Sequence, residues 1–491
     1  MWGRIRKSLI ALFCGQGLVL LEQVLLVPLF LAHWSPGEYG NWLTLSALTG
    51  LIGLLDLGMN TGAAVRLTQV HAQGNSSRFY ELQHSAMAFY FWVAVLGSLL
   101  LTAGVLAFKS WPVGGIAYFP SPAARWTTWL LGIQMLWSMP HGFLTATYRT
   151  TGDMATTQWL VNGRKLVEIT CVLIGLLLGV SMVGVASIEL ATLALALVFT
   201  AWHCRHWCRV SLPGLSRASW RGLADLLHPS FSFWTINWAQ LFGQNVPVLL
   251  IRVLVGEIAV AVFVLCRTVT SLVRQGITLI HNSLWPEITR METVGDWAQL
   301  RTLHRFVLVG SSGAAIMATG ILWFSGDSLV RIWMRGKLPV DFVLLRLWLL
   351  HLSLSIPWTS GVLLAQASNR LGKFTRALSL STLVGVLCSA LLMKWLKTWS
   401  VPVGFILGEA LFCCHPLIRE SCRIVKEPYA PFARWFWKGW TLVLAATLGA
   451  GWAVESFSRS AGLLKWGLLA ASSAGAVLFV GRTAWPRKPA P

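Results

Sequence analysis

Charged residues are scarce in this chain. Only 12% of its 491 residues are Asp, Glu, Lys or Arg, whereas 55% are hydrophobic, and the mean hydropathy is +0.64. An ordinary soluble domain carries about 25% charged residues. This composition therefore excludes a typical soluble protein and indicates a chain that lies within a lipid bilayer.

Several motifs are also missing, and each absence excludes a class of function. The phosphate-binding pattern Gly-x4-Gly-Lys-Ser/Thr does not occur, so we expect no nucleotide hydrolysis. The segments between the apolar runs are short, which leaves little room for the external active site of a polymerase or ligase of lipid-linked glycans. We therefore predict that the chain is not an enzyme.

The cysteines and histidines form no recognisable framework. The nine cysteines fall in apolar runs or on the predicted cytoplasmic side, which predicts no disulfide bonds. In His203-Cys204-Arg205-His206-Trp207-Cys208 and in Cys413-Cys414-His415 the potential ligands are crowded together, and no second ligand pair follows at the spacing of a zinc site. We predict no metal and no other cofactor.

Apolar runs of about 20 residues, the length of a membrane-spanning helix, recur along the sequence. The predicted fold is an all-α polytopic membrane protein with about 14 transmembrane helices. The predicted spans are 9–33, 41–65, 85–107, 126–148, 166–184, 186–203, 229–251, 257–283, 306–324, 343–366, 378–396, 401–418, 439–455 and 463–481.

The net charge of +21 is a topology signal. Most of the 39 Lys and Arg residues fall in alternate loops that include both ends of the chain, and cytoplasmic loops are the ones enriched in these residues. This predicts a multi-pass protein with both termini in the cytoplasm. The same charge attracts anionic membrane lipids, and we expect no nucleic-acid partner.

An internal repeat divides the chain. Gly37-Glu38 opens the second span as Gly256-Glu257 opens the eighth, and Gly152 and Gly372 follow the fourth and tenth spans at nearly the same offset. The repeat predicts a six-helix lobe at 1–212, a second six-helix lobe at 213–425, and two additional helices within 426–491. Because six is even, the lobes are expected to be related by a two-fold pseudo-axis along the membrane normal, with a central cavity between them.

One stretch carries a resemblance to a known family. It reads Ser35-Pro36-Gly37-Glu38-Tyr39-Gly40-Asn41-Trp42, followed by Leu54-Leu55-Asp56-Leu57-Gly58-Met59. With the pattern of spans and the cytoplasmic loop after the sixth span, residues 1–425 resemble the polysaccharide-transporter branch of the multidrug/oligosaccharidyl-lipid/polysaccharide (MOP) exporter superfamily. These proteins are the O-antigen and exopolysaccharide flippases.

The resemblance implies a V-shaped fold of two lobes in the bacterial cytoplasmic (inner) membrane. It implies that an undecaprenyl-diphosphate-linked oligosaccharide is moved from the inner to the outer leaflet by alternating access. Expected partners are this lipid-linked substrate, membrane lipids, a proton or sodium ion, and a glycan polymerase with its export machinery. The branch commonly has twelve spans and lipid II flippases have fourteen, so a lipid II flippase is an alternative. A multidrug cation antiporter of the same fold and a membrane enzyme acting on a lipid-linked glycan are further alternatives.

The most informative feature is a ladder of basic residues within the eighth span. Arg267, Arg274 and His281 are spaced by seven residues, so they project from one face of a helix. An arginine at the bilayer centre costs at least about 2.5–3.5 kcal/mol, so this face must meet water, protein or an anionic ligand. Arginine can grip a diphosphate in a bidentate manner, or it can form a structural ion pair with Asp56, Glu22 or Glu409.

Other polar residues within spans complete the predicted site. The resemblance places the first two spans of each lobe around the cavity, where uncharged amides suit a ligand with many hydroxyl groups. The cavity candidates beside the ladder are Gln16, Gln23, Asn60, Asn237, Trp238, Gln240 and Gln244. Intramembrane carboxylates often serve as ion relays, so Asp56 and Glu22 are the candidates for ion coupling. The same polar residues also serve as contacts between helices in many membrane proteins.

Overall fold

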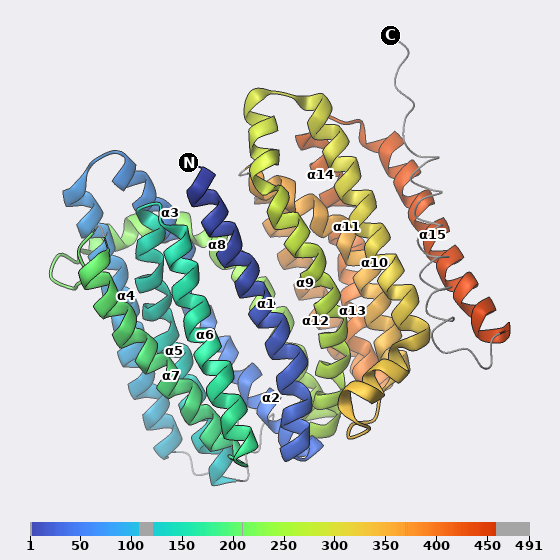
Figure 1. The fold of residues 1–491 in the computed structure, drawn as a ribbon, viewed down its shortest axis with the longest axis horizontal. Coiled ribbons are helices and arrows are strands. Elements are labelled where there is room, and N and C mark those ends of the chain that lie inside the picture. Colours follow the sequence, from blue (N-terminus) through green and yellow to red (C-terminus); the bar gives the residue numbers. More distant parts are fainter. Residues whose placement is uncertain (1, 108–120, 209, 369, 371, 458–491) are drawn as a thin grey trace. The chain divides into compact units, whose positions relative to one another are not determined.

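The computed structural model describes residues 2–107, 121–208, 210–368, 370 and 372–457, and its regular elements are all helical (Figure 1). The predicted all-α fold is confirmed. The elements are α1 (Trp2–His33), α2 (Pro36–Gly50), η1 (Leu51–Asp56), α3 (Met59–Ala72), α4 (Ser76–Ala107), α5 (Pro122–Thr150), α6 (Met154–Leu177), α7 (Met182–Trp207), α8 (Trp220–Leu254), α9 (Glu257–Val294), α10 (Trp297–Met334), α11 (Phe342–Ala367), α12 (Gly372–Leu396), η2 (Lys397–Trp399), α13 (Ser400–Glu409), η3 (Ala410–Cys414), α14 (His415–Ile424) and α15 (Tyr429–Phe457).

The helices follow the predicted spans closely. Among the described residues, 7 helical segments are long and apolar enough to cross a membrane. One of them, Gly372–Ile424, contains two predicted spans. The spans predicted in α5, α8, α9 and α15 are helical as well, whereas the span predicted at 166–184 extends past the end of α6 into the turn at 178–181 and the start of α7. The last predicted span, 463–481, lies outside the described residues.

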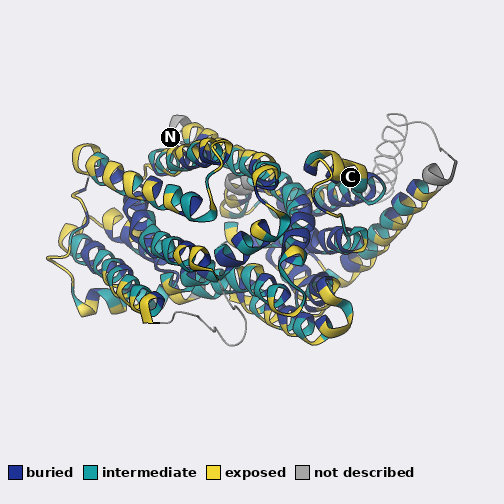
Figure 2. Cartoon of the chain, turned by 90° about the horizontal axis from the view of Figure 1, so that it is seen from below, coloured by how far each residue is buried: buried dark blue, intermediate teal, exposed yellow. Residues whose placement is uncertain are grey.

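By its internal contacts the chain divides into two units, Met1–Ala261 and Val262–Pro491. In the first unit, α1 packs against α6, α5 packs against α4 and α7, and α8 packs against α2, α3 and α4. Buried side chains of α3, α4, α5 and α8 form its main apolar core, which includes Met59, Leu82, Phe143 and Leu226. Figure 2 shows the alternation of buried and exposed positions along the helices.

Ion pairs and hydrogen bonds at the start of α8 connect this helix to α4 of the first unit. Arg78 of α4 donates hydrogen bonds to Asp225 and Glu81, each at 2.7 Å, and Ser219 donates to Glu81 at 2.5 Å. The hydrogen bond from Arg78 holds the pKa of the Asp225 carboxyl below its ordinary value. The repeat assigns α8 to the second lobe, whereas contacts group it with the first unit. The duplication therefore stays a prediction.

The second predicted span is broken in its middle. Helix α2 continues into η1, and the chain then turns at Leu57 and Gly58, with φ angles of 50° and 70°, before α3 begins. Asp56 lies at the end of η1, directly before this turn, and its carboxylate accepts a 2.6 Å hydrogen bond from the hydroxyl group of Tyr90.

In the second unit, α11 lies against α10, α13 and α14, and α15 packs along α10. Helices α12 and α13 form a hairpin around the short turn η2. Their close approach depends on small residues, because a Cβ at Gly404 would lie 2.4 Å from the carbonyl oxygen of Gly385. Immediately after Glu409 the helix widens into the π-helical segment η3.

The landmarks of the predicted repeat lie at the beginnings of helices. Ser35 caps α2 and forms a capping box with Glu38, while Glu257 begins α9. The two helix starts are in contact, because a Cβ at Gly40 would lie 2.0 Å from the carbonyl oxygen of Glu257. Arg252, near the end of α8, forms a 3.2 Å ion pair with Glu257.

Candidate substrate and ion site

Two members of the basic ladder on α9 contact the same neighbouring helix. Arg274 donates a hydrogen bond to Ser355 of α11 at 3.0 Å. His281 lies one heptad further along α9 and approaches the hydroxyl group of Ser360, also on α11, at 3.4 Å. This is the geometry expected of two side chains that project from one helix face. In this structure, that part of the ladder faces protein.

Arg274 is the start of a buried polar network in the second unit. Its Nη2 lies 3.5 Å from Nδ1 of His351, and Nε2 of His351 lies 3.0 Å from the Glu409 carboxylate. Trp358 donates its indole N–H to the other Glu409 oxygen at 3.0 Å. If Nδ1 of His351 accepts from Arg274, then Nε2 carries the proton and donates to Glu409. The guanidinium, the neutral imidazole and the carboxylate then form a chain without net charge.

Glu409 and His351 were not predicted as ion-coupling residues. Their side chains are only 8% and 5% exposed, and both lie in helices that the sequence marks as apolar spans. An ionisable residue in such a span is by default a candidate functional residue, so both residues could have been named as candidates from the sequence. The sequence could not predict that they contact Arg274, because the network joins α9, α11 and α13, which are far apart in the chain and have no regular spacing.

The surroundings of His281 and Arg267 differ from those of Arg274. His281 is buried, and its Nε2 lies 2.7 Å from the hydroxyl oxygen of Ser311 on α10. It is a hydrogen-bonded histidine between three helices. Arg267 is half-buried, and its guanidinium carbon lies 5.4 Å from the centre of the Phe263 ring. A cation over an aromatic ring is attracted by the negative face of the ring, so Phe263 helps to hold Arg267 within the span.

The amides of α8 divide between two faces of the helix. One face of α8 meets α2 and η1 and carries Trp234, Leu241 and Asn245. Trp234 donates to the Leu54 carbonyl at 3.1 Å. A Cβ built on Gly50 of α2 would lie 3.2 Å from the side-chain amide of Asn245. Asn237, Gln240 and Gln244 are spaced by three and four residues, which places them on another face. Gln240 and Gln244 are exposed and Asn237 is half-buried.

An exposed amide row within a predicted span is informative, because hydrocarbon offers no hydrogen-bond partner for it. Such a row is better accommodated beside a water-filled path than beside lipid. Trp238 belongs to the same helix, and its ring stacks on Phe242 with ring centres 4.9 Å apart. The stacking leaves Trp238 half-buried.

The two predicted ion-coupling carboxylates both have partners within the first unit. Asp56 accepts a hydrogen bond from the hydroxyl group of Tyr90 at 2.6 Å. Glu22 of α1 forms a 2.7 Å ion pair with Lys165 of α6, which also pairs with Glu168 at 2.8 Å. Glu22 therefore belongs to an ion-pair cluster between α1 and α6.

The remaining candidates are half-buried positions in the first unit. Gln16 and Gln23 lie on α1, and Gln23 has an interaction with a neighbour. The Asn60 carbonyl accepts a 3.3 Å hydrogen bond from Arg149, and its side-chain amide lies where a Cβ on Gly142 would be. Asn60 thus lies between α3 and α5.

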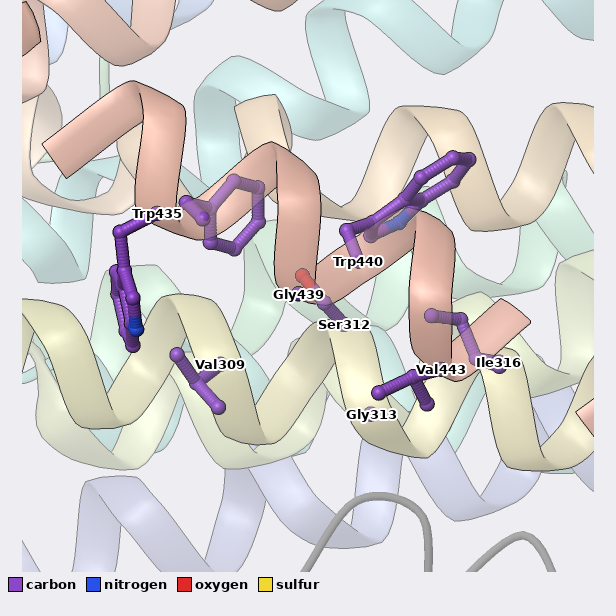
Figure 3. A pocket seen from close by; sticks show the side chains of 9 residues that line it. Val309, Ser312, Gly313, Ile316, Trp435, Gly439, Trp440 and Val443 are labelled. Carbon is purple, nitrogen blue, oxygen red and sulfur yellow. The ribbon is translucent and has the colours of Figure 1, made fainter. Parts of the chain in front are cut away.

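A pocket lies between α10 and α15 in the second unit, apart from the ladder contacts (Figure 3). Val309 and Ile316 of α10 and Trp435 and Trp440 of α15 are among the residues that line it. It opens on the face of α10 that is turned to α15, whereas Ser311 contacts His281 of α9. Its lining contains no charged residue, so it is not a candidate site for an ionic ligand.

Comparison with known proteins supports the fold. No protein-family model matches the sequence, and no curated protein matches it. The structure is similar to an inward-facing multidrug resistance MATE family transporter of the MOP superfamily, with a TM-score of 0.68 and 14% identity over 85% of this chain and 99% of that chain. The fold is that of MOP superfamily transporters.

Two further solved structures agree. An outward-facing multidrug resistance MATE family transporter of the superfamily has a TM-score of 0.61 and 16% identity over 86% of this chain and 96% of its own. A MOP superfamily transporter from Pyrococcus furiosus has a TM-score of 0.60 and 15% identity over 87% and 96%. The binding pocket of that protein is described as having a reversed polarity that suggests a different function.

Proposed function

We propose that the protein is a flippase that moves an undecaprenyl-diphosphate-linked oligosaccharide from the inner to the outer leaflet of the bacterial cytoplasmic membrane by alternating access. The observation that carries the proposal is the pair of arginines, Arg267 and Arg274, within a single helix of a transporter fold. A diphosphate that leaves water needs cationic partners. The exposed amides of α8 suit the hydroxyl groups of the sugars.

A multidrug cation antiporter is the second candidate, because solved structures of this fold include multidrug transporters. Such a protein needs carboxylates that are available to a cationic substrate or to the coupling ion. Asp56 and Glu22 are instead held by Tyr90 and Lys165, respectively. Arg274 is likewise held, by Ser355 and the His351–Glu409 pair, so these contacts do not decide between the two functions. Of the two carboxylates, Asp56 is the better ion-coupling candidate because Glu22 already has a cationic partner.

Charge substitutions in the ladder distinguish these functions. We expect Arg274→Ala and Arg267→Glu to abolish the transfer of lipid-linked oligosaccharide between leaflets of reconstituted vesicles. Arg274→Lys should retain part of the activity, because it restores the charge without the bidentate fork. The measurement is the fraction of oligosaccharide that becomes accessible on the opposite leaflet.

The control is the export of a hydrophobic cation by the same vesicles. In an antiporter, the ladder variants would retain or improve cation export, and Asp56→Asn would abolish it. Because Arg274 also contacts the Glu409 network, transfer by each variant is divided by the amount of folded protein in the vesicles. Normal oligosaccharide transfer by a folded Arg267→Glu/Arg274→Glu double variant would contradict the headgroup proposal.

The proposed orientation has its own test. Ser121, Ser328, Ser76 and Ser216 all have exposed side chains, and each is replaced by cysteine in a variant without native cysteines. A membrane-impermeant thiol reagent applied from outside should label positions 121 and 328, and it should label positions 76 and 216 only after the membrane is opened. Labelling of position 76 in intact cells would overturn the predicted cytoplasmic loops.

A further inference from the structure

A second buried cluster of titratable groups lies beside the N-terminal end of α15. His304 is near the beginning of α10, Cys422 is in α14, and Glu427 is in the turn that leads to α15. One potential ligand atom from each side chain, a ring nitrogen, a sulfur and a carboxylate oxygen, lies within 4.8 Å of the other two. The His304 and Glu427 side chains are 0% and 2% exposed, and Cys422 is fully buried.

Two atoms that face this cluster have no hydrogen-bond partner among the described residues. They are Nδ1 of His304 and Oε2 of Glu427. The two atoms lie 3.4 Å apart but are not aligned for a hydrogen bond. Buried polar atoms without partners are rare in proteins, and each one calls for an ion, a water molecule or another explanation.

The second ring nitrogen of His304 has a hydrogen-bond partner. Nε2 lies 3.1 Å from the hydroxyl oxygen of Ser421, whose proton is directed to the Ile418 carbonyl oxygen at 2.9 Å. In the neutral tautomer in which Nε2 donates to Ser421, Nδ1 is a lone pair on the side of Glu427. Two arrangements make this approach favourable: a proton on Nδ1, which gives an ion pair with Glu427, or a metal ion between the two atoms.

The other atoms of Glu427 are held as they would be beside a bound metal ion. Oε1 accepts a 2.6 Å hydrogen bond from Nε of Arg305, so Oε2 is the oxygen left for a ligand. The backbone amide of Glu427 donates to the Cys422 carbonyl at 2.8 Å, which joins two of the three side chains through the backbone. Outer hydrogen bonds of this kind orient the ligands in metal sites.

We propose that Nδ1 of His304, Sγ of Cys422 and Oε2 of Glu427 bind one Zn²⁺ ion. Zinc accepts nitrogen, sulfur and oxygen ligands together, whereas Mg²⁺ and Ca²⁺ take oxygen ligands. The Cys422 thiol loses its proton to the solvent on binding, and a water molecule fills the fourth position. The ion fastens the α14–α15 turn to α10. The site is independent of the proposed transport function.

The experiment uses the full-length protein, purified in detergent and treated with a chelator, with Co²⁺ as a spectroscopic probe. We expect one equivalent of Co²⁺ to bind with a thiolate charge-transfer band in the near ultraviolet. Cys422→Ser should abolish this band, and Ser421→Ala, which removes an outer hydrogen bond, should weaken binding about 10–100-fold. Cys388→Ser replaces a half-buried cysteine of α12 outside the cluster, and it should leave the band unchanged.

Zinc provides a second readout that does not depend on colour. Zn²⁺ should raise the melting temperature of the wild type and of Cys388→Ser, but not that of Cys422→Ser, because a ligand that binds only the folded state stabilises it. A band that persists in Cys422→Ser overturns the proposal. If Cys422→Ser does not fold, the wild type decides: no stoichiometric Co²⁺, or Co²⁺ without a thiolate band, overturns the proposal and leaves a buried His304–Glu427 ion pair.

Discussion

The Glu409→Ala variant should lose about 3–5 kcal/mol of its free energy of unfolding, the effect of removing one partner of a buried charge pair. Glu409 accepts hydrogen bonds from His351 and Trp358, and through His351 it compensates the charge of Arg274. Removal of the carboxylate leaves two buried donors without an acceptor and the half-buried guanidinium of Arg274 without a counter-charge. Thermal and denaturant unfolding in detergent, followed by tryptophan fluorescence, measures the loss.

Two variants make this prediction specific to the network. Glu420→Ala removes an acid whose partner Lys373 is 59% exposed, so its effect should be about 0–1 kcal/mol. The double variant Arg274→Met/Glu409→Leu removes both charges and fills their volume, and it should be more stable than Glu409→Ala. If Glu409→Ala and Glu420→Ala had equal effects, the network would not stabilise the second unit as described.

Gly58→Ala should be strongly destabilising, because it combines a positive φ with a close backbone contact. Gly58 has a φ of +70°, and a Cβ built there lies 2.4 Å from the carbonyl oxygen of Ser230 and 2.4 Å from the amide nitrogen of Trp234. A left-handed conformation costs a residue with a side chain about 1–2 kcal/mol, and overpacking adds about 1–3 kcal/mol. The backbones of α3 and α8 would have to separate.

Gly74→Ala is the matched control. Gly74 has a φ of +71°, but no atom lies within 4 Å of a Cβ built there. It should therefore show only the conformational effect of about 1–2 kcal/mol, and the difference between the two variants isolates the contact with α8. Equal melting temperatures for the two variants would show that α8 does not pack against the turn at Gly58.

Much of the fold could be predicted because hydrophobicity in a membrane is a local property of the sequence. The span predicted at 343–366 is α11, and the span at 85–107 lies within α4. The break within the second span was not predicted. It arises because Leu57 and Gly58 both adopt a positive φ, and a sliding average of hydropathy does not detect this turn.

Less of the candidate site could be predicted from the sequence. A spacing of seven residues was enough to place Arg274 and His281 on one face of α9, because helix geometry is local. It was not enough to identify what that face meets. His351 and Glu409 are far from Arg274 in the chain, and Lys165 is far from Glu22, so only the packed helices bring these partners together.

The sequence by itself determined that this protein is an all-helical membrane protein and which faces of its helices carry charge. Both properties follow from composition and from the helical period, which act over one or two turns. The tertiary structure decided which charges are compensated: Glu22 by Lys165, Arg274 by Ser355 and the His351–Glu409 pair. It also brought together His304, Cys422 and Glu427. A buried charge is compensated by atoms that lie a few ångströms away in space. These atoms can belong to residues that are far apart in the sequence, so the sequence alone does not identify them.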